Sequence, residues 1–316
     1  MACYHPMNAY RSKNGRDPKT GKWPIVFNIT QGYSDMPVVV PCGQCIGCRL
    51  ERSRQWAIRC LHEASLYTDN CFITLTYDND HLPADLSLKK REMVLFLKRL
   101  RKKFGNGIRF FQCGEYGELC KICGNNRLKC KCTNFVSSLG RPHHHAIIFN
   151  FDFPDKKLWS VRQGVALYRS AMLEELWPYG FSTIGNVTFE SAAYVARYIT
   201  KKITGDPAPE HYNGREPEYV TMSRRPGIAR KWFEKFYSDV YTTDSIVVRP
   251  GLVARPPKYY DNLYDLQDSD SFRRIKNRRV NMAKLSEHNT FDRLAVREQV
   301  QYAKFKKLIR PLENNL

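Results

Sequence analysis

The spacing of apolar residues predicts four helices in the first two thirds of the chain. Apolar positions recur at intervals of three and four within residues 49–67, 87–105, 166–177 and 190–202. The clearest helix is 87–105, where Ser87 is a suitable N-cap and Gly105 a suitable stop. Its apolar stripe, which we expect in the core, consists of Met93, Phe96, Leu97, Leu100 and Phe104.

Short runs rich in β-branched and aromatic residues predict strands between these helices. They cover residues 71–77, 107–118, 143–151 and 181–189. Because single helices separate the strands without a strict β-α repeat, the pattern indicates an α+β layer fold. The first forty residues show little periodicity, and we expect them to form an irregular arm.

Changes in composition predict three parts of the chain. Residues 1–65 form a Cys-rich arm followed by a basic helix, and residues 66–205 form the central domain, with a four-Cys insertion at 120–132. The polar stretch "GDPAPEHYNGREPE" that follows is typical of a boundary. Residues 206–316 then form a basic C-terminal region.

The charge of the chain indicates a polyanionic partner. There are 51 Lys and Arg against 31 Asp and Glu, which gives a formal net charge of +20. Nucleic acid is the leading partner for such a protein. No apolar run approaches the length of a bilayer span, and the first residues, "MACYHPMNAY", lack the apolar core of a signal peptide. We therefore expect no membrane partner and a cytosolic location.

Two groups of arginines are candidates for DNA phosphate contacts. Arg49, Arg52 and Arg54 lie on the first predicted helix, where we expect them and Arg59 to face outward. Arg224 and Arg225 lie in "SRRPGIARKWFEKF", which interleaves arginine with aromatic residues. The alternative for both groups is an ordinary solvated surface.

Eight of the eleven cysteines have the spacing of metal ligands. One group is Cys120, Cys123, Cys130 and Cys132, and the other is Cys42, Cys45 and Cys48, with Cys3 as the expected fourth thiolate. Four thiolates on short spacers suit a structural Zn²⁺ ion. The alternative is reduced cysteine without metal. We expect Cys60, Cys71 and Cys113 to lie in the core.

The stretch "RPHHHAIIFN" predicts a pair of metal ligands on a strand. Side chains alternate between the faces of a strand, so His143 and His145 point the same way and His144 points the other way. The two imidazoles can therefore share one cation, with an acidic residue as a further ligand. The alternative is a set of ordinary polar strand residues.

On the helix 190–202, Tyr194 and Tyr198 are four residues apart, and Lys201 continues the same stripe. Two tyrosines at this spacing could simply pack on a sheet, but a lysine on the same stripe argues against a purely apolar face. Together with a cation site and a basic surface, they suggest phosphodiester cleavage by a tyrosine nucleophile. Lys201 would stabilise negative charge or help to deprotonate the phenol.

The motifs "CFITLTY", "CGEYGE", "RPHHHAIIF" and "SAAYVARYITKK" occur here in that order. This combination resembles the rolling-circle replication initiators of gokushoviruses, a group of microviruses, which are HUH endonucleases. "PCGQCIGCRLERSRQWAIRC" and "MSRRPGIARKWFEKF" are also similar to sequences of that group, so the resemblance covers most of residues 38–236.

The resemblance implies a central antiparallel sheet flanked by helices, to which the Cys-rich zinc-binding insertions are added. It also implies Mg²⁺ or Mn²⁺ held by His143, His145 and Glu115, and Tyr194 and Tyr198 as nucleophiles that form a covalent 5′-phosphotyrosine link. The implied partners are single-stranded DNA, the duplex phage origin and a host helicase with other replication proteins, in the cytoplasm of the infected bacterium.

Two features depart from the family pattern. His144 occupies the usually hydrophobic middle position, and a four-cysteine insertion follows "GEYG", which leaves Glu118 as a competitor for the third ligand. Two other functions stay open at this point. One is a zinc-stabilised nucleic-acid-binding protein without catalysis, and the other is a metal hydrolase that activates water.

Overall fold

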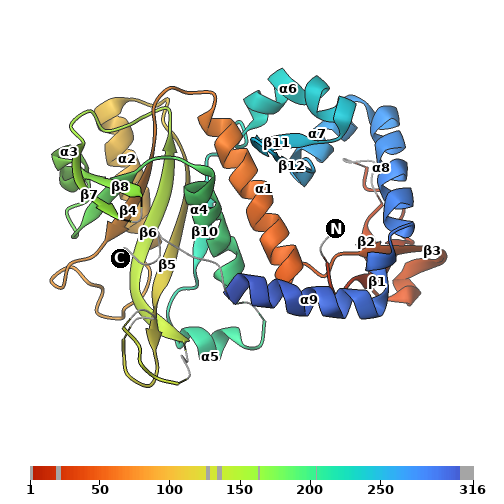
Figure 1. The fold of residues 1–316 in the computed structure, drawn as a ribbon, viewed down its shortest axis with the longest axis horizontal. Coiled ribbons are helices and arrows are strands. Elements are labelled where there is room, and N and C mark those ends of the chain that lie inside the picture. The colour runs from red at the N-terminus through yellow and green to blue at the C-terminus, as the bar shows by residue number, and fades with distance from the viewer. Residues whose placement is uncertain are drawn as a thin grey trace. The chain divides into compact units, whose positions relative to one another are not determined.

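A computed structural model of the chain describes residues 3–18, 23–125, 129–133, 137–162, 164–203 and 205–306 (Figure 1). The described residues form two compact units. One comprises the residues up to Glu51 together with those from Arg274 onward, and the other comprises Arg52–Arg273. The boundaries fall within α1 (Ile46–Ala64) and α8 (Ser269–Lys284).

An antiparallel sheet organises the unit Arg52–Arg273. Its strand order is β10-β5-β6-β4-β9-β8-β7. The strands are β4 (Asn70–Thr76), β5 (Arg109–Cys120), β6 (Ser137–Phe149), β7 (Lys157–Arg162), β8 (Val165–Arg169), β9 (Ser182–Gly185) and β10 (Tyr219–Met222). This confirms the predicted α+β class with a central antiparallel sheet. The sheet extends past residue 205, because β10 pairs with β5; the predicted three-part division stays a prediction.

Helices cover both faces of this sheet. On one face, α2 (Lys90–Phe104) and α3 (Ala171–Leu176) enclose a core that includes Ile73, Ile148, Ile184, Phe96 and Trp177. The predicted stripe of α2 lies in this core, with Phe104 partly buried. On the other face, α4 (Phe189–Lys201) contacts β5, β6 and β10. Cys60, Cys71 and Cys113 are fully buried, as predicted.

Residues after β10 add a helical layer to the same unit. The elements are α5 (Ala208–Tyr212), which precedes β10, then α6 (Arg230–Thr243), the hairpin β11 (Ile246–Arg249) and β12 (Leu252–Ala254), and α7 (Lys258–Gln267). Aromatic rings join this layer to α1: His62 stacks on Trp232 with ring centroids 3.5 Å apart, and its Nδ1 lies 2.9 Å from the Tyr260 hydroxyl. We find no helix in the described parts of the chain with the length and apolarity needed to cross a membrane.

The second unit contains a small sheet of its own, with strand order β2-β1-β3. Its elements are β1 (Met7–Ser12), β2 (Ile25–Val26), β3 (Gly32–Val40), α9 (Phe291–Lys306) and two short 3₁₀ helices, Ile29–Gln31 and Glu287–Asn289. The predicted irregular arm is therefore wrong. These strands bury few side chains, so they lack the apolar alternation from which strands are predicted.

Three local predictions are also wrong. Ser87 is not the N-cap of α2, which begins at Lys90; its Oγ accepts a hydrogen bond from the Glu216 backbone instead, at 2.8 Å. The predicted helix 166–177 begins as strand β8, and α3 starts only after Ser170, whose Oγ accepts from the Leu173 N–H. Arg59 does not face outward, because it is buried between the rings of Trp56 and Tyr259.

Candidate active site

The register of β5 and β6 brings one carboxylate and two imidazoles together. Glu115 lies directly opposite His143, and Cys113 lies opposite His145. Glu115 Oε1 is 3.0 Å from His143 Nε2 and 2.8 Å from His145 Nε2. The three side chains are 1–6% exposed. A carboxylate buried beside two imidazole nitrogens is a donor set suited to a divalent cation.

Neighbouring groups orient both imidazoles. His143 Nδ1 lies 3.2 Å from the Arg141 carbonyl oxygen, which can only accept a hydrogen bond. Nδ1 therefore carries the proton in the neutral ring, and Nε2 presents its lone pair beside Glu115. His145 Nδ1 lies 2.9 Å from the Thr74 hydroxyl. Such outer partners are typical of histidines that bind metal.

The structure brings Glu115 into this group and leaves Glu118 outside it. The possible ligand atoms of Glu115, His143 and His145 all lie within 4.8 Å of one another. Glu118 lies opposite Leu139, beyond an irregularity in the register between Tyr116 and Glu118.

His144 points to the opposite face, as the alternation predicted. It is fully buried, and its Nε2 and Nδ1 lie 3.2 Å from the hydroxyls of Tyr77 and Tyr219, respectively. Burial lowers the pKa of His144 to about 3. This explains how an imidazole occupies a core position: it is neutral, and both ring nitrogens have partners.

Helix α4 places a tyrosine hydroxyl beside the carboxylate and imidazoles. The helix begins with a capping box formed by Thr188 and Ser191. Two turns later, the Tyr194 hydroxyl lies 3.3 Å from His145 Nε2 and 3.4 Å from Glu115 Oε1. Tyr194 is 1% exposed. The structure thus joins three segments that are far apart in the sequence.

Two predicted residues of α4 cannot be placed in the same way. Tyr198 and Lys201 belong to the helix, but their side chains lie outside the described part of the chain. Arg197 was missed by the sequence analysis, although it lies three residues after Tyr194 on the same helix. Its guanidinium is 5.7 Å from the centre of the Tyr194 ring. The i, i+3 spacing was the signal that could have identified it.

Each predicted cysteine group is assembled, with the four sulfur atoms within 4.8 Å of one another. In the first group, the backbone N–H of Cys42 donates to Cys3 Sγ at 3.3 Å, and that of Cys45 donates to Cys42 Sγ at 3.3 Å. In the second, hydrogen bonds from the backbone, that of Cys123 foremost, lower the pKa of Cys120 to about 6. Thiolate character of this kind suits metal binding.

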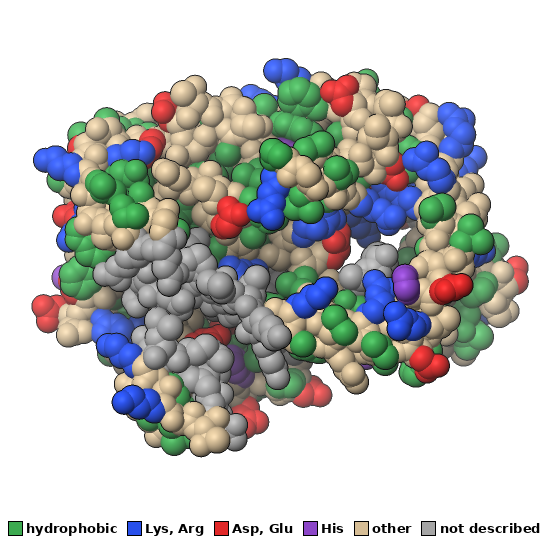
Figure 2. All heavy atoms as spheres, viewed as in Figure 1, with side chains coloured by type: hydrophobic (Ala, Val, Ile, Leu, Met, Phe, Trp, Pro, Cys, Tyr) green, Lys and Arg blue, Asp and Glu red, His purple; other side chains and the backbone are tan. Residues whose placement is uncertain are grey.

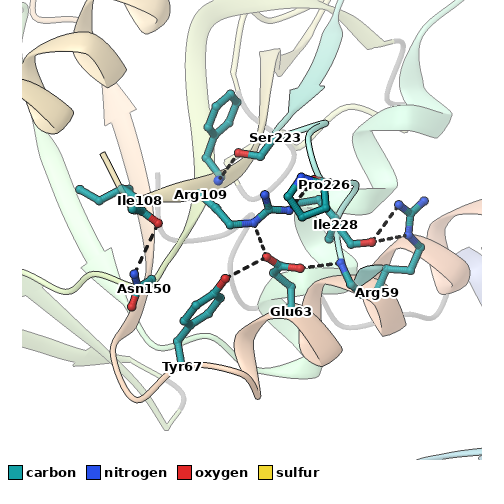
Figure 3. A network of polar contacts seen from close by, with 12 residues as sticks. Arg59, Glu63, Tyr67, Ile108, Arg109, Asn150, Ser223, Pro226 and Ile228 are labelled. Atoms are coloured by element: carbon teal, nitrogen blue, oxygen red, sulfur yellow. Dashed lines mark hydrogen bonds and ion pairs between the residues drawn. The ribbon is translucent and has the colours of Figure 1, made fainter. Parts of the chain in front are cut away.

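A network of buried polar contacts fixes the loop that carries Arg224 and Arg225. Figure 3 shows Glu63 of α1 between Tyr67, Arg109 and this loop. Glu63 Oε2 accepts from the Ala229 N–H at 2.5 Å, and Arg109 donates to the Pro226 carbonyl at 2.8 Å. Arg59 adds two hydrogen bonds to the Ile228 carbonyl, at 3.0 and 3.2 Å (Figure 3).

The predicted DNA-contacting arginines differ in exposure. Arg224 and Arg225 are exposed at the tip of this loop, and Arg52 is exposed on α1. Arg49 and Arg54 are half-buried, and Arg54 donates to the Arg255 carbonyl at 3.0 Å.

Comparisons with known proteins give the family. Residues 70–203 match a family model of replication-associated proteins of the ORF2 type. The chain is 34% identical over 277 residues to the replication-associated protein VP4 of Bdellovibrio phage phiMH2K, which covers 84% of this chain and 77% of that protein. It is 30% identical over 305 residues to the replication-associated protein ORF2 of Spiroplasma virus 4, covering 90% of this chain and 87% of that protein.

A third relative is the replication-associated protein ORF4 of Chlamydia phage 1, at 29% identity over 73% of this chain and 55% of that protein. No solved structure matches the chain significantly. The match to the phiMH2K protein spans most of both sequences, and the three relatives come from gokushoviruses. The chain therefore belongs to the family of gokushovirus replication-associated proteins.

Proposed function

We propose that this protein initiates rolling-circle replication by cutting DNA with Tyr194. The observation that carries the proposal is the position of the Tyr194 hydroxyl, 3.3 Å from His145 Nε2 and 3.4 Å from Glu115 Oε1. A buried phenol with no chemical role has no reason to lie against a carboxylate and two imidazoles. The family membership supports a role in phage replication.

Glu115, His143 and His145 would hold a divalent cation, Mg²⁺ or Mn²⁺. Their mixed oxygen and nitrogen donors fit Mn²⁺ well, and the partners of His143 and His145 hold both rings in place. When bound, the cation would polarise the scissile phosphate and orient it for in-line attack.

The residues of α4 would perform the nucleophilic step. The phenol oxygen of Tyr194 bonds to phosphorus while the bond to O3′ of the preceding nucleotide breaks, so the products are a 5′-phosphotyrosine and a free 3′-hydroxyl. Because a phenol has a pKa of about 10, its deprotonated form needs stabilisation at neutral pH. Arg197, with its guanidinium 5.7 Å from the ring centre, and Lys201 would supply positive charge.

The phosphotyrosine link preserves the energy of the phosphodiester bond and allows the strand to be rejoined. Tyr198, one helical turn further on, would act in the next round. The substrates would be single-stranded DNA and the duplex phage origin, in the cytoplasm of the infected bacterium, with host helicase and replication proteins as partners. The exposed Arg52, Arg224 and Arg225, with Arg49 and Arg54, would contact phosphates.

The two cysteine groups would each hold one structural Zn²⁺ ion. In both groups four sulfur atoms lie within 4.8 Å of one another, which is the spacing that tetrahedral coordination needs. The ligands would be Cys3, Cys42, Cys45 and Cys48 in one site, and Cys120, Cys123, Cys130 and Cys132 in the other.

Denaturing gel electrophoresis would test the proposal. Purified protein is incubated with phage single-stranded DNA and Mn²⁺, and wild type is compared with Tyr194→Phe, Tyr198→Phe and the double variant. We expect a protein-linked DNA band that is absent from the double variant. Cleavage that survives the double substitution would instead indicate a hydrolase that activates water. Binding without cleavage would indicate a binding protein.

A further inference from the structure

The hairpin that carries the candidate active site also carries the second cysteine group. From the pair Glu115 and His143, the β5–β6 ladder continues to the pair Cys120 and Ser137. Five residues of strand span about 17 Å. The Cys120–Cys132 group therefore lies at the end of the hairpin, at a distance from the active site that the paired strands fix.

The turn at this end has a defined shape. The Gly124 N–H donates to the Cys120 carbonyl, and the Cys120 N–H donates to the Asn125 carbonyl, both at 2.8 Å. Gly124 adopts a φ of +69°, a left-handed conformation that favours glycine. Four sulfur atoms within 4.8 Å would lock this turn around a metal ion. Its lysines are thus presented by a rigid support.

The exposed side chains of the turn are mainly basic. Lys121, Lys129 and Lys131 are exposed, and no acidic residue occurs between Glu118 and Asp152. The four basic residues within 119–133 outnumber the two negative charges that Zn²⁺ with four thiolates carries. Figure 2 shows Lys and Arg side chains at this end of the hairpin, at the lower left.

Basic residues also lie between the turn and the active site. Arg141 is exposed two residues before His143, and its guanidinium is held by the Tyr77 and Asp78 carbonyls at 3.1 and 2.9 Å. Arg215 donates to the Leu139 carbonyl at 3.2 Å, further along β6. Positive charge therefore follows the hairpin from the catalytic residues to its end.

We propose that the Cys120–Cys132 turn is a zinc-stabilised finger that binds the phosphates of the DNA strand leaving the active site. The inference rests on the proposed function, because DNA is the substrate of that function. With strand phosphates spaced by about 3.4 Å in a duplex, the finger would reach about five nucleotides from the scissile bond. It would hold the strand in line with Tyr194.

The salt dependence of DNA affinity tests this finger. The variant Lys121→Ala/Lys129→Ala/Lys131→Ala is compared with Lys98→Ala/Lys102→Ala/Lys103→Ala, which removes equal charge from α2, on the face of the sheet opposite α4. The probe is an origin-derived single-stranded oligonucleotide, with affinity measured by fluorescence anisotropy from about 50 to 200 mM salt. We expect the slope of log affinity against log salt to fall by about 2 in the finger variant and to stay near wild type in the α2 variant.

Two outcomes would overturn the inference: an unchanged slope in the finger variant, or an equal fall in both variants. Zinc content of the finger variant, measured by mass spectrometry, must match wild type, so that the comparison reports charge and not folding. The covalent adduct of wild type is measured in parallel. A wild type that forms no adduct contradicts the proposed function, whereas the slopes judge the finger alone.

Discussion

At the residue scale, Glu115 is the centre of the candidate site. It is 1% exposed, and its Oε1 lies within 3.0 Å of both His143 Nε2 and His145 Nε2. A buried carboxylate needs a partner that offsets the loss of solvation. A divalent cation between these three side chains would supply it.

This arrangement predicts the effect of Glu115→Gln. Loss of the carboxylate charge should weaken Mn²⁺ binding by at least about 100-fold, since even outer partners of metal ligands contribute about 10–100-fold. Glu118→Gln is the matched control, because Glu118 lies opposite Leu139 and outside the group. Isothermal titration with Mn²⁺ measures both. Equal affinities in the two variants would be inconsistent with Glu115 as a ligand.

The histidine pair could be predicted from the sequence because strand alternation alone sets which side chains share a face. The choice between Glu115 and Glu118 could not be made in this way. It depends on the register of β5 against β6, and the irregularity after Tyr116 changes that register. The burial of Arg59 was also hidden, since its two aromatic partners come from residues 56 and 259.

At the element scale, Glu63 joins α1 to β5 and to the loop before α6. It is 2% exposed, pairs with Arg109, and accepts the Ala229 N–H. The exposed Arg224 and Arg225 thus lie on a loop whose base is fixed. We expect Glu63→Ala to lower the free energy of unfolding by about 3–5 kcal/mol, because it leaves Arg109 without its carboxylate partner.

Urea denaturation measures this loss. Glu234→Ala is the control, since Glu234 pairs with Arg230 on the exposed side of α6, and a surface pair contributes at most about 1 kcal/mol. Similar losses in the two variants would show that the Glu63 network does not hold the loop.

The cysteine groups give a second prediction at this scale. Wild type should contain two equivalents of zinc, and Cys42→Ser and Cys120→Ser should each lose one, because a structural site needs all four thiolates. Mass spectrometry of the purified proteins measures the content. Zinc content that is unchanged in both variants would refute both sites.

Long, periodic elements such as α2 and β6 were predictable because their buried faces dominate their sequences. Strand β8 was not, since residues 166–169 fit a helix equally well, and only pairing with β7 and β9 decides. Strands β1 and β3 were missed because most of their side chains are exposed. Tertiary pairing settles such segments, and one sequence does not contain it.

At the scale of the whole molecule, a neutral buried histidine links folding to pH. Burial lowers the pKa of His62 to about 3, against 6.5 for the free side chain. Between these values the unfolded chain binds the proton and the folded chain does not. The free energy of unfolding should therefore fall as pH drops from about 6.5 toward 3.

Comparison with His62→Gln isolates this contribution, because glutamine offers hydrogen bonds but binds no proton. We expect the variant to show a shallower fall in unfolding free energy between about pH 6.5 and 4, measured by urea denaturation at each pH. An identical slope would show that His62 is protonated in the folded state or does not contribute.

The central claim is that Tyr194, positioned by Glu115 and His145, becomes covalently bonded to DNA. The most direct measurement is to trap the adduct with single-stranded origin DNA and Mn²⁺, digest the DNA and protein, and sequence the nucleotide-bearing peptide by tandem mass spectrometry. The account predicts a phosphonucleotide on Tyr194 in the wild type, and on Tyr198 only in Tyr194→Phe or after a further round. Cleaved DNA with free 5′-phosphates and no modified tyrosine would contradict it.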